Sequence, residues 1–521
     1  MSQNLVAAIE LSSRMVTAVV GRKEPDGALN ILAAEREPSQ DFIRRGKIYN
    51  PDKMGQCVKS LVTRLEAKLD KKITQMYVGI GGMGLHSVQN KIVQNYTEST
   101  KISQEIVDSI MDSNRAHEIQ GYEILDVIPL EYRMGNIAQL DPVGIVSNQI
   151  EGNFINLVTS PVVREMIETS FRTADMRIAD DLVITANPLA DMILTDSEKR
   201  SGCVFLDMGA ETTTVAVYNG AMLRFMSVIP LGGHNVTNDL VNILHIPEAE
   251  AKVLKREYGR AYINPDGESE TASETIQLSG GNTETRANIE HMIEARMSEI
   301  LQNVAKQIDL ALVGDESNEL LGGIVVTGCA ATIKDLIEAL THYTKVNKVR
   351  VVTTSPVTVR CGSGMDFVKD GHANGALAIM MRGTMDCVTE KDQKEDIFTG
   401  PTEDEIKELT KRVKTMVEQV TLYFEDLEEM CKKRKLDDAV AIVGAMKDTS
   451  SEIQEMMPRL PEDSDVYSLA KETVASMVDA EQMVEDLRNR KGGKSKKSGG
   501  GGWWKRVRTV LEDMVKDPDE E

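Results

Sequence analysis

The chain of 521 residues lacks the cysteine spacings that mark disulfide frameworks and structural zinc sites. Its six cysteines are scattered and form no Cys-x-x-Cys pair, which indicates a reducing cytosol. No apolar run approaches the ~18–20 residues that span a bilayer. A signal peptide is also not expected, because the opening segment Leu5–Val20 contains Glu10 and Arg14. We therefore expect a chain that does not cross a membrane.

Aromatic residues are scarce, at 4% of the chain, and its two tryptophans are adjacent. Apolar residues around them recur at three- and four-residue steps, which predicts one apolar helix face. That face comprises Trp503, Trp504, Val507, Val510, Leu511, Met514 and Val515. Basic residues, among them Lys505, Arg506 and Arg508, accompany it, and residues 488–508 contain no Asp or Glu. The pattern is typical of a membrane-targeting amphipathic helix, here 503–517, behind a flexible basic linker, 491–502. The alternative is a helix docked on its own domain.

The rest of the chain is acidic. The formal net charge is −22, and basic residues concentrate after residue 488. The body should therefore avoid nucleic acid, while the tail should be attracted to anionic lipid. A chain of this length is also expected to fold as two or more domains.

Two strand–turn–strand segments have acidic and hydroxyl residues at their turns. In the first, Val6–Ala8 and Val16–Val20 flank Glu10-Leu11-Ser12-Ser13-Arg14. In the second, Cys203–Leu206 and Val215–Tyr218 flank Asp207-Met208-Gly209-Ala210-Glu211-Thr212-Thr213-Thr214. Two such turns facing each other across a cleft are suited to hold a nucleotide's phosphates through backbone N–H groups. Their carboxylates would hold magnesium through water.

Two segments with small-residue turns follow. Ile229–Thr237 predicts a strand that ends in Gly232-Gly233 and opens a helix. Gly322–Ala331 predicts a buried strand that ends in Gly328-Cys329-Ala330, before a helical pattern at Ile333–Leu340. Small residues at this last turn would let the backbone approach an adenine ring.

These four segments, in this order, resemble the actin/Hsp70-like ATPase superfamily, and more closely the FtsA family of bacterial cell-division proteins. Ile128-Pro129-Leu130-Glu131-Tyr132, followed by Asp141-Pro142-Val143-Gly144, is similar to that family's inserted subdomain. The resemblance covers residues 4–388 and the terminal helix. It implies an α/β, actin-like two-lobed ATPase fold with the FtsA-type inserted subdomain, to which this chain adds a C-terminal helical extension and the amphipathic helix.

The resemblance also implies how the chain is divided. Subdomain 1A would comprise residues 1–84, 162–198 and 356–390, and the inserted subdomain 1C residues 85–161. Subdomains 2A and 2B would comprise residues 199–355, and the helical extension residues 391–490.

By this resemblance, the nucleotide site draws residues from all four segments and from one helix. They are Glu10, Ser12, Ser13, Asp207, Gly209, Glu211, Thr212, Thr213, Gly232, Gly233, Lys255, Gly328, Cys329 and Ala330. The implied cofactors are ATP and Mg²⁺, with magnesium near Glu10 and Asp207, or near Glu211. Lys255 corresponds to a family lysine beside the nucleotide, although a helical lysine is more often a solvated surface residue. No residue stands out as a catalytic base, so at most slow ATP hydrolysis is expected.

Several residues depart from the family's pattern at the nucleotide. Ser12 replaces a glycine in the first turn, Ala210, Glu211 and Thr214 alter the second, and Cys329 replaces a glycine near the adenine. If Glu211 points into the cleft, its repulsion of a phosphate at ~4 Å costs about 4 kcal/mol at an effective dielectric near 20. We therefore expect weakened ATP binding. The alternative is that the turns shape the fold and bind no ATP.

The resemblance implies several partners. The small subdomain, with its polar segment Asn264–Thr283, would receive the C-terminal peptide of the tubulin-like protein FtsZ, and Arg296 would contact this acidic partner. The alternative for Arg296 is an i, i+3 ion pair with Glu299. The other implied partners are further copies of the chain in filaments, anionic membrane lipids and other divisome proteins.

Residues 391–490 lie outside the resemblance and predict long helices. Thr402 and Glu405 form a capping-box pattern. Apolar residues then recur with heptad-like spacing at Ile406, Leu409, Val413, Met416, Val420, Tyr423, Leu427 and Met430. A second long helix is predicted from Leu469 to Leu487. We expect a helical hairpin that buries its own seam; the alternative is a dimer.

Together these features predict a protein at the cytoplasmic face of the inner membrane, at the division site. It would polymerise, anchor FtsZ filaments through its terminal helix and help to recruit the divisome. One alternative is a homologue of type IV pilus assembly ATPases, which share the inserted subdomain but would not need the Trp-Trp helix. Another is an actin-fold ATP-dependent kinase or chaperone, against which the altered phosphate turns argue.

Overall fold

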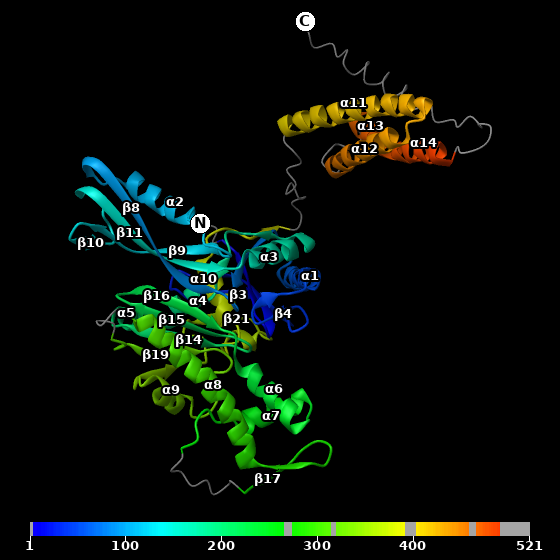
Figure 1. Ribbon diagram of the computed structural model, residues 1–521. Helices are drawn as coiled ribbons and strands as arrows, with labels where there is room; N and C mark the ends of the chain where they lie inside the picture. The colour runs from blue at the N-terminus through cyan, green and yellow to red at the C-terminus, as the bar shows by residue number, and fades with distance from the viewer. Residues whose placement is uncertain (1–3, 265–272, 314–318, 391–402, 458–464, 490–521) are drawn as a thin grey trace. The chain divides into compact units, whose positions relative to one another are not determined.

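A computed structural model describes residues 4–264, 273–313, 319–390, 403–457 and 465–489 (Figure 1). The chain forms two compact units, Met1–Asp392 and Gln393–Glu521. In the described ranges, no helix is long and apolar enough to cross a bilayer. The predicted basic linker 491–502, the amphipathic helix 503–517 and the predicted cap residue Thr402 lie outside the described residues.

The first sheet of unit 1 contains the first predicted strand–turn–strand segment. β1 (Val6–Leu11) and β2 (Met15–Lys23) are antiparallel, and the turn between them is Ser12–Arg14. The sheet has the order β12-β7-β1-β2-β3-β21, and β13 also pairs with β7. Its other strands are β3 (Leu29–Pro38), β7 (Gln75–Ile80), β12 (Arg177–Ile178), β13 (Val183–Ile184) and β21 (Val359–Cys361).

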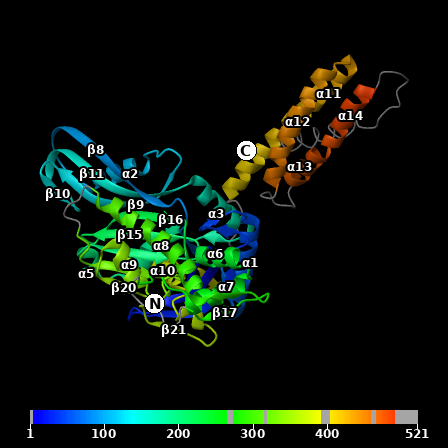
Figure 2. The same cartoon turned by 60° about the horizontal axis from the view of Figure 1, so that its bottom comes forward.

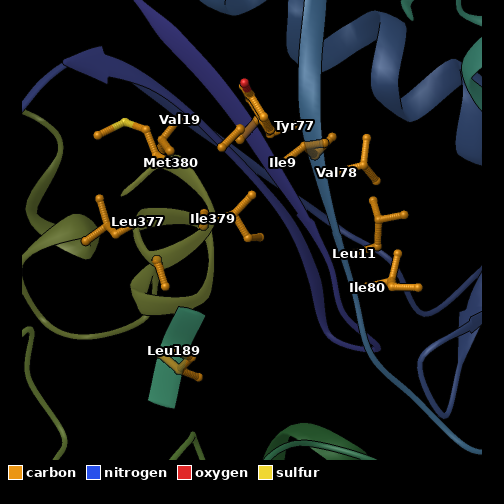
Figure 3. Close-up of a cluster of buried hydrophobic side chains, with 14 of the residues drawn as sticks. Ile9, Leu11, Val19, Tyr77, Val78, Ile80, Leu189, Leu377, Ile379 and Met380 are labelled. Atoms are coloured by element: carbon orange, nitrogen blue, oxygen red, sulfur yellow. The ribbon is translucent and has the colours of Figure 1, made fainter. Parts of the chain in front are cut away.

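Four main helices cover this sheet. They are α1 (Pro51–Leu69), α3 (Pro161–Thr173), α4 (Ala186–Ile193) and α10 (Asn374–Arg382). α1 packs against α3 and β3, while α10 packs against β1, β2 and α4. Ile9 and Val19 on the strands lie with Leu377 and Ile379 of α10 in one buried apolar cluster (Figure 3). This cluster fixes the carboxyl end of β1 close to the first turn of α10.

The second sheet contains the other predicted loops. Its strands β14 (Cys203–Met208), β15 (Thr213–Asn219) and β16 (Met222–Ile229) are antiparallel neighbours, and β19 (Gly323–Thr327) runs parallel to β14, with β20 (Val349–Val351) beside it. The accompanying helices are α5 (Asp196–Arg200), α6 (Gly233–Leu244), α7 (Glu248–Tyr258), α8 (Arg286–Leu312) and α9 (Leu336–Thr344). β17 (Thr275–Gln277) and β18 (Thr283–Thr285) form a small hairpin. The predicted strands and glycine turns of this lobe are thus confirmed.

An inserted layer extends the same sheet. β8 (His86–Lys101), β9 (Glu123–Met134), β10 (Ile137–Gln139) and β11 (Val146–Thr159) are joined to β16 by the pairing of His86 with Ser227. α2 (Gln104–Arg115) packs on β8 and β11, as both views show (Figures 1 and 2). Ile102, Ile110, Tyr132, Met134, Ile150 and Phe154 form a separate small core here. The remaining short elements are β4 (Ile43–Arg44), β5 (Lys47–Ile48), β6 (Lys71–Ile73), β22 (Val388–Glu390) and the 3₁₀ turn η1 (Asp366–Val368).

Unit 2 confirms the predicted helical extension and corrects its detail. Its helices are α11 (Glu403–Lys433), α12 (Leu436–Met456), α13 (Asp465–Ala475) and α14 (Met477–Asn489). Val413, Val420 and Leu427 of the predicted seam are buried in their shared core. The single second helix predicted from Leu469 to Leu487 is wrong: it is two helices, interrupted at Ser476. Sequence reasoning missed α12 because its buried positions include alanine and serine. These small residues do not stand out from the exposed positions as an apolar face would.

Candidate functional site

Glu10 lies at the end of β1 and packs directly on the first turn of α10. A Cβ on Gly375 would stand 2.2 Å from its Oε1, so only glycine permits this approach. The backbone N–H of Ala376 donates a hydrogen bond to the Glu10 carboxylate. The N-terminus of α10 therefore holds an acidic side chain in place, as the helix dipole favours.

Asp207 lies near the end of β14 and packs against the turn after β19. Gly328 has φ +97°, and a Cβ there would stand 2.5 Å from Asp207 Oδ1 and 2.4 Å from the Met208 carbonyl oxygen. The Ala330 N–H donates to that carbonyl oxygen at 2.9 Å. The predicted adenine-side turn is thus joined to the predicted phosphate turn by direct contact.

Glu10 and Asp207 form an acidic pair at the facing turns. Burial, and then the charge of Asp207, raise the pKa of Glu10 to about 7. Burial raises the pKa of Asp207 to about 6. Among the described residues, no group of three or more His, Cys, Asp or Glu side chains is arranged to hold a metal. The chemistry of two carboxylates that interact in this way fits a magnesium ion held through its water ligands, because a cation relieves their mutual repulsion.

The glycine turn before α6 locks against the second phosphate turn. The Gly233 N–H donates to the Gly209 carbonyl oxygen at 3.0 Å. A Cβ on Gly232 would stand 2.6 Å from the Ala210 carbonyl oxygen, which explains the glycine. The Gly209 N–H is itself bonded to the Thr212 carbonyl oxygen at 2.8 Å. The second phosphate turn, the glycine turn before α6 and the turn Gly328–Ala330 therefore form one compact assembly.

Lys255 of α7 points to this assembly. Its Nζ donates to the Gly233 carbonyl oxygen at 2.8 Å and to Thr237 Oγ1 at 2.9 Å. Burial lowers the pKa of Lys255, and the neighbouring Arg14 adds to this effect. A solvated surface position, the alternative considered for Lys255, is not what the structure shows. Burial raises the pKa of the Cys329 thiol, and Arg14, which lies close to this thiol, acts to lower its pKa. Two cations, Arg14 and Lys255, therefore lie near the turn that contains Cys329.

Ser13 and Glu211 both bind the tight turn between β4 and β5. The Gly46 N–H donates to Ser13 Oγ at 2.7 Å, and the Arg45 N–H donates to the Glu211 carboxylate. Arg45 and Gly46 have φ +48° and +73°, as a two-residue hairpin turn of type I′ requires. The central N–H groups of such a turn are not used by the hairpin itself, so these two side chains supply their acceptors.

Two of the predicted hydroxyl groups donate to backbone carbonyl oxygens instead. Ser12 Oγ donates to the Met15 carbonyl oxygen at 2.8 Å, within its own turn. Thr213 is buried, and its Oγ1 donates to the Leu231 carbonyl oxygen at 2.9 Å. In this structure both hydroxyls stabilise the turns. Thr212 contributes its backbone carbonyl to the turn.

Arg296 lies on α8, away from these turns, and is already paired within the chain. Its guanidinium donates to both carboxylate oxygens of Asp239 on α6, at 2.5 and 3.0 Å. It also bonds to Glu299, the i, i+3 partner considered from the sequence. The partner missed was Asp239, because it lies 57 positions away.

Two buried polar atoms near Glu10 have no hydrogen-bond partner among the described residues. They are Thr185 Oγ1, before α4, and Asn374 Oδ1, at the start of α10. Gly79, which pairs with Glu10, has Thr185 Oγ1 beside it. Unpaired buried acceptors and donors beside the carboxylates fit a site for polar ligands.

Sequence reasoning missed Arg14, the Arg45–Gly46 turn and the Gly375–Ala376 contact. Arg14 could have been found, because it is a cation inside a predicted phosphate turn. The other two depend on contacts between residues far apart in the chain, such as the 166 positions between Arg45 and Glu211. No local pattern signals contacts of that kind.

The amino-acid sequence matches two family models and several curated proteins. The family model "Cell division protein FtsA" matches residues 204–413, and the model "SHS2 domain inserted in FTSA" matches residues 82–158. The cell division protein FtsA of Porphyromonas gingivalis is 28% identical over 346 residues, which cover 64% of this chain and 70% of that protein. The cell division protein FtsA of Escherichia coli K12 is 26% identical over 345 residues, covering 64% of this chain and 80% of that protein.

A solved structure shares the fold. The PilM–PilN type IV pilus biogenesis complex matches with a TM-score of 0.51 and 14% sequence identity, over 72% of this chain and 98% of that chain. At that identity the likeness concerns the fold alone.

The two sheets, the facing turns and the inserted layer define an actin-like protein with an inserted SHS2 subdomain. The sequence matches then identify one family within the actin-like proteins, because residues 82–158 match the inserted subdomain of FtsA and residues 204–413 match the FtsA family model. The chain belongs to the FtsA family of cell-division proteins.

Proposed function

We propose that this chain is an actin-like cell-division protein that assembles at the cytoplasmic face of the inner membrane. There it anchors FtsZ filaments through its C-terminal amphipathic helix and helps to recruit the divisome. The observation that carries the proposal is the combination of an FtsA-family body with the amphipathic sequence pattern around Trp503-Trp504, which follows a basic, glycine-rich segment. The relatives' role in cell division supports it.

The membrane contact of one copy should be modest. An interfacial helix buries only part of each apolar side chain, and ordering its backbone costs about 1–2 kcal/mol per residue. Each basic residue near an anionic surface contributes about 1 kcal/mol. Filaments of many copies would bind far more tightly, because their helices act at high effective concentration. The proposal therefore couples attachment to assembly.

Sedimentation with anionic liposomes tests the membrane part. The intact chain should pellet, while a chain ending at Gly502 and a Trp503→Ala/Trp504→Ala chain should stay in solution. A Cys431→Ser chain, altered far from the tail in sequence, serves as the matched control and should pellet. Equal sedimentation of the intact and shortened chains would remove the tether from the proposal.

We propose that the facing turns bind ATP weakly, with magnesium near Glu10 and Asp207. Support comes from the acidic pair, from Arg14 and Lys255 near Cys329, and from the unpaired polar atoms beside Glu10. The bound metal would neutralise the carboxylates, while the cations would face the phosphates. Calorimetry with Mg-ATP tests this part, and no heat at millimolar nucleotide would overturn it.

We propose that the α6–α8 surface receives the FtsZ tail peptide, with Arg296 as one contact. The pair with Asp239 holds Arg296 in place, and an acidic peptide must share or displace it. Asp239→Asn should therefore strengthen binding of the peptide, and Arg296→Ala should weaken it, in a fluorescence anisotropy assay. Unchanged affinity in both variants would exclude Arg296 as a contact.

We propose no direct role for the helical extension in FtsZ binding. Its described helices have their own core, so it is suited to alter tether reach or filament bundling.

We also propose subdomain boundaries that give the ranges 1–84, 85–161, 162–198, 199–355 and 356–390. Limited proteolysis should cut near residues 390–402 first if the extension is a separate unit, as the division at Asp392 suggests.

A further inference from the structure

The Glu211 carboxylate contacts the β4–β5 hairpin and not the turn proposed for the adenine side. The turn Gly328–Ala330, proposed for the adenine side, contacts Asp207 and Met208. Glu211 follows them in the β14–β15 turn and contacts the β4–β5 hairpin instead. Along the chain, Asp207 at the adenine-side contact comes before Glu211 at the hairpin contact, and this order leads us to assign Glu211 to the end where the last phosphate would lie.

The surroundings of Glu211 are built to receive an anion. The Arg45 N–H donates to its carboxylate, and the next N–H in the same turn, that of Gly46, donates to Ser13. The turn cannot shift easily, because a Cβ on Gly46 would stand 2.4 Å from Gly82 Cα and the Met83 N–H donates to the Arg45 carbonyl oxygen at 2.8 Å. These N–H groups belong to the first lobe, whereas Glu211 belongs to the second.

Glu211 therefore joins the two lobes with a negative charge. A phosphate at this end of the site would meet that charge and would compete for the Arg45 N–H. Arg14 and Lys255 both lie near Cys329, in the turn proposed for the adenine side, and offer cations to phosphates nearer the base.

We propose that the Glu211 carboxylate takes the place of the terminal phosphate, so that the site selects a nucleoside diphosphate over the corresponding triphosphate. This inference rests on the proposed nucleotide binding. It explains how the chain can keep a nucleotide site although Glu211 stands where the family pattern has a glycine. It also makes the contact between the two lobes independent of a third phosphate. The lobes are held together by the chain's own anion.

Calorimetry with Mg-ADP and Mg-ATP tests the proposal on the full chain. The unaltered chain should bind ADP at least tenfold more tightly than ATP. Glu211→Gln keeps an oxygen that accepts the Arg45 N–H but removes the charge, and it should reduce this ratio to within about threefold by strengthening ATP binding. Glu66→Gln is the matched control, because Glu66 also accepts a backbone N–H, that of Ile73 at 2.9 Å, outside the site. It should leave the ratio unchanged.

A second measurement needs no nucleotide. Glu211→Ala should speed hydrogen–deuterium exchange in the peptide that contains Arg45 and Gly46, because it removes the acceptor of one of these N–H groups. Equal affinities for ADP and ATP in the unaltered chain, or the same preference in Glu211→Gln, would overturn the proposal while leaving nucleotide binding intact. No binding of either nucleotide by any variant would overturn the proposed nucleotide site itself.

Discussion

Neutralising Glu10 should stabilise the folded chain at alkaline pH and have little effect in acid. The pKa of this carboxyl rises from its ordinary value of 4.5 to about 7 in the folded chain, through burial and the charge of Asp207. At ~1.4 kcal/mol per pKa unit, the shift corresponds to about 3 kcal/mol. That figure is an upper limit, because Glu10 keeps some contact with solvent.

The sign follows from proton binding. A raised pKa means that the folded chain holds the proton more tightly than the unfolded chain. The resulting stabilisation is complete below about pH 4.5 and is lost as the pH rises through about 7. Glu10→Gln stays neutral throughout, so its gain in unfolding free energy over the unaltered chain should be near zero at pH 4.5 and up to about 3 kcal/mol at pH 8.

Urea titrations followed by far-ultraviolet circular dichroism, without magnesium or nucleotide, measure this gain. Tryptophan fluorescence is unsuitable, because Trp503 and Trp504 lie in the tail. Hydrogen–deuterium exchange in peptides from β1 and α10 shows whether the gain is local to Glu10. A gain of equal size at pH 4.5 and pH 8 would refute the reasoning.

A second glutamate provides a control of opposite sign. Burial opposes ionisation of Glu198, but hydrogen bonds from Arg350 and Thr195 outweigh it and lower its pKa. Arg350 Nη2 lies 2.9 Å from Glu198 Oε2. Glu198→Gln should therefore reduce the unfolding free energy at pH 8, and the loss should shrink as the pH falls below about 4.5.

Three further predictions use matched pairs. Gly328→Ala should lower stability by more than Gly27→Ala in thermal melts, because both have positive φ but only the Gly328 Cβ would meet other atoms, at 2.4 and 2.5 Å. Leu427→Ala should cost about 2–5 kcal/mol and speed hydrogen exchange only in the extension, whereas Leu422→Ala, at a side chain 60% exposed, should change little. Deleting residues 403–489 should leave the affinity for the FtsZ tail peptide unchanged while altering filament bundling, and loss of peptide binding would contradict the assignment of that peptide to the α6–α8 surface.

The sequence predicts the strands and turns of the two lobes well, because the turns are short and each functional residue lies next to the strand that positions it. Glu10 and Asp207 each stand at the end of an apolar strand, so one pattern gives both the strand and the carboxylate at its end. The contact of Glu211 with Arg45 could not be predicted in this way, since it joins a turn in each lobe. In the extension, α11 has a clear apolar seam, whereas α12 places Ala439 and Met446 against its neighbours without strong periodicity.

The position of Glu211 changes what its charge means for the site. From the sequence alone, a glutamate in a phosphate turn is a defect whose cost depends on where the side chain points. In the structure its carboxylate accepts an N–H from the opposite lobe, so the charge has a partner before any nucleotide arrives. A triphosphate must displace that contact, whereas a shorter ligand need not.

If closure of the two lobes controls filament assembly, assembly would depend less on nucleotide exchange than on the contact between Glu211 and Arg45. Glu211→Ala should therefore impair filament assembly, and the multivalent membrane binding that assembly provides, even when nucleotide is saturating. Electron microscopy on lipid monolayers would check this, and filaments indistinguishable from those of the unaltered chain would refute it.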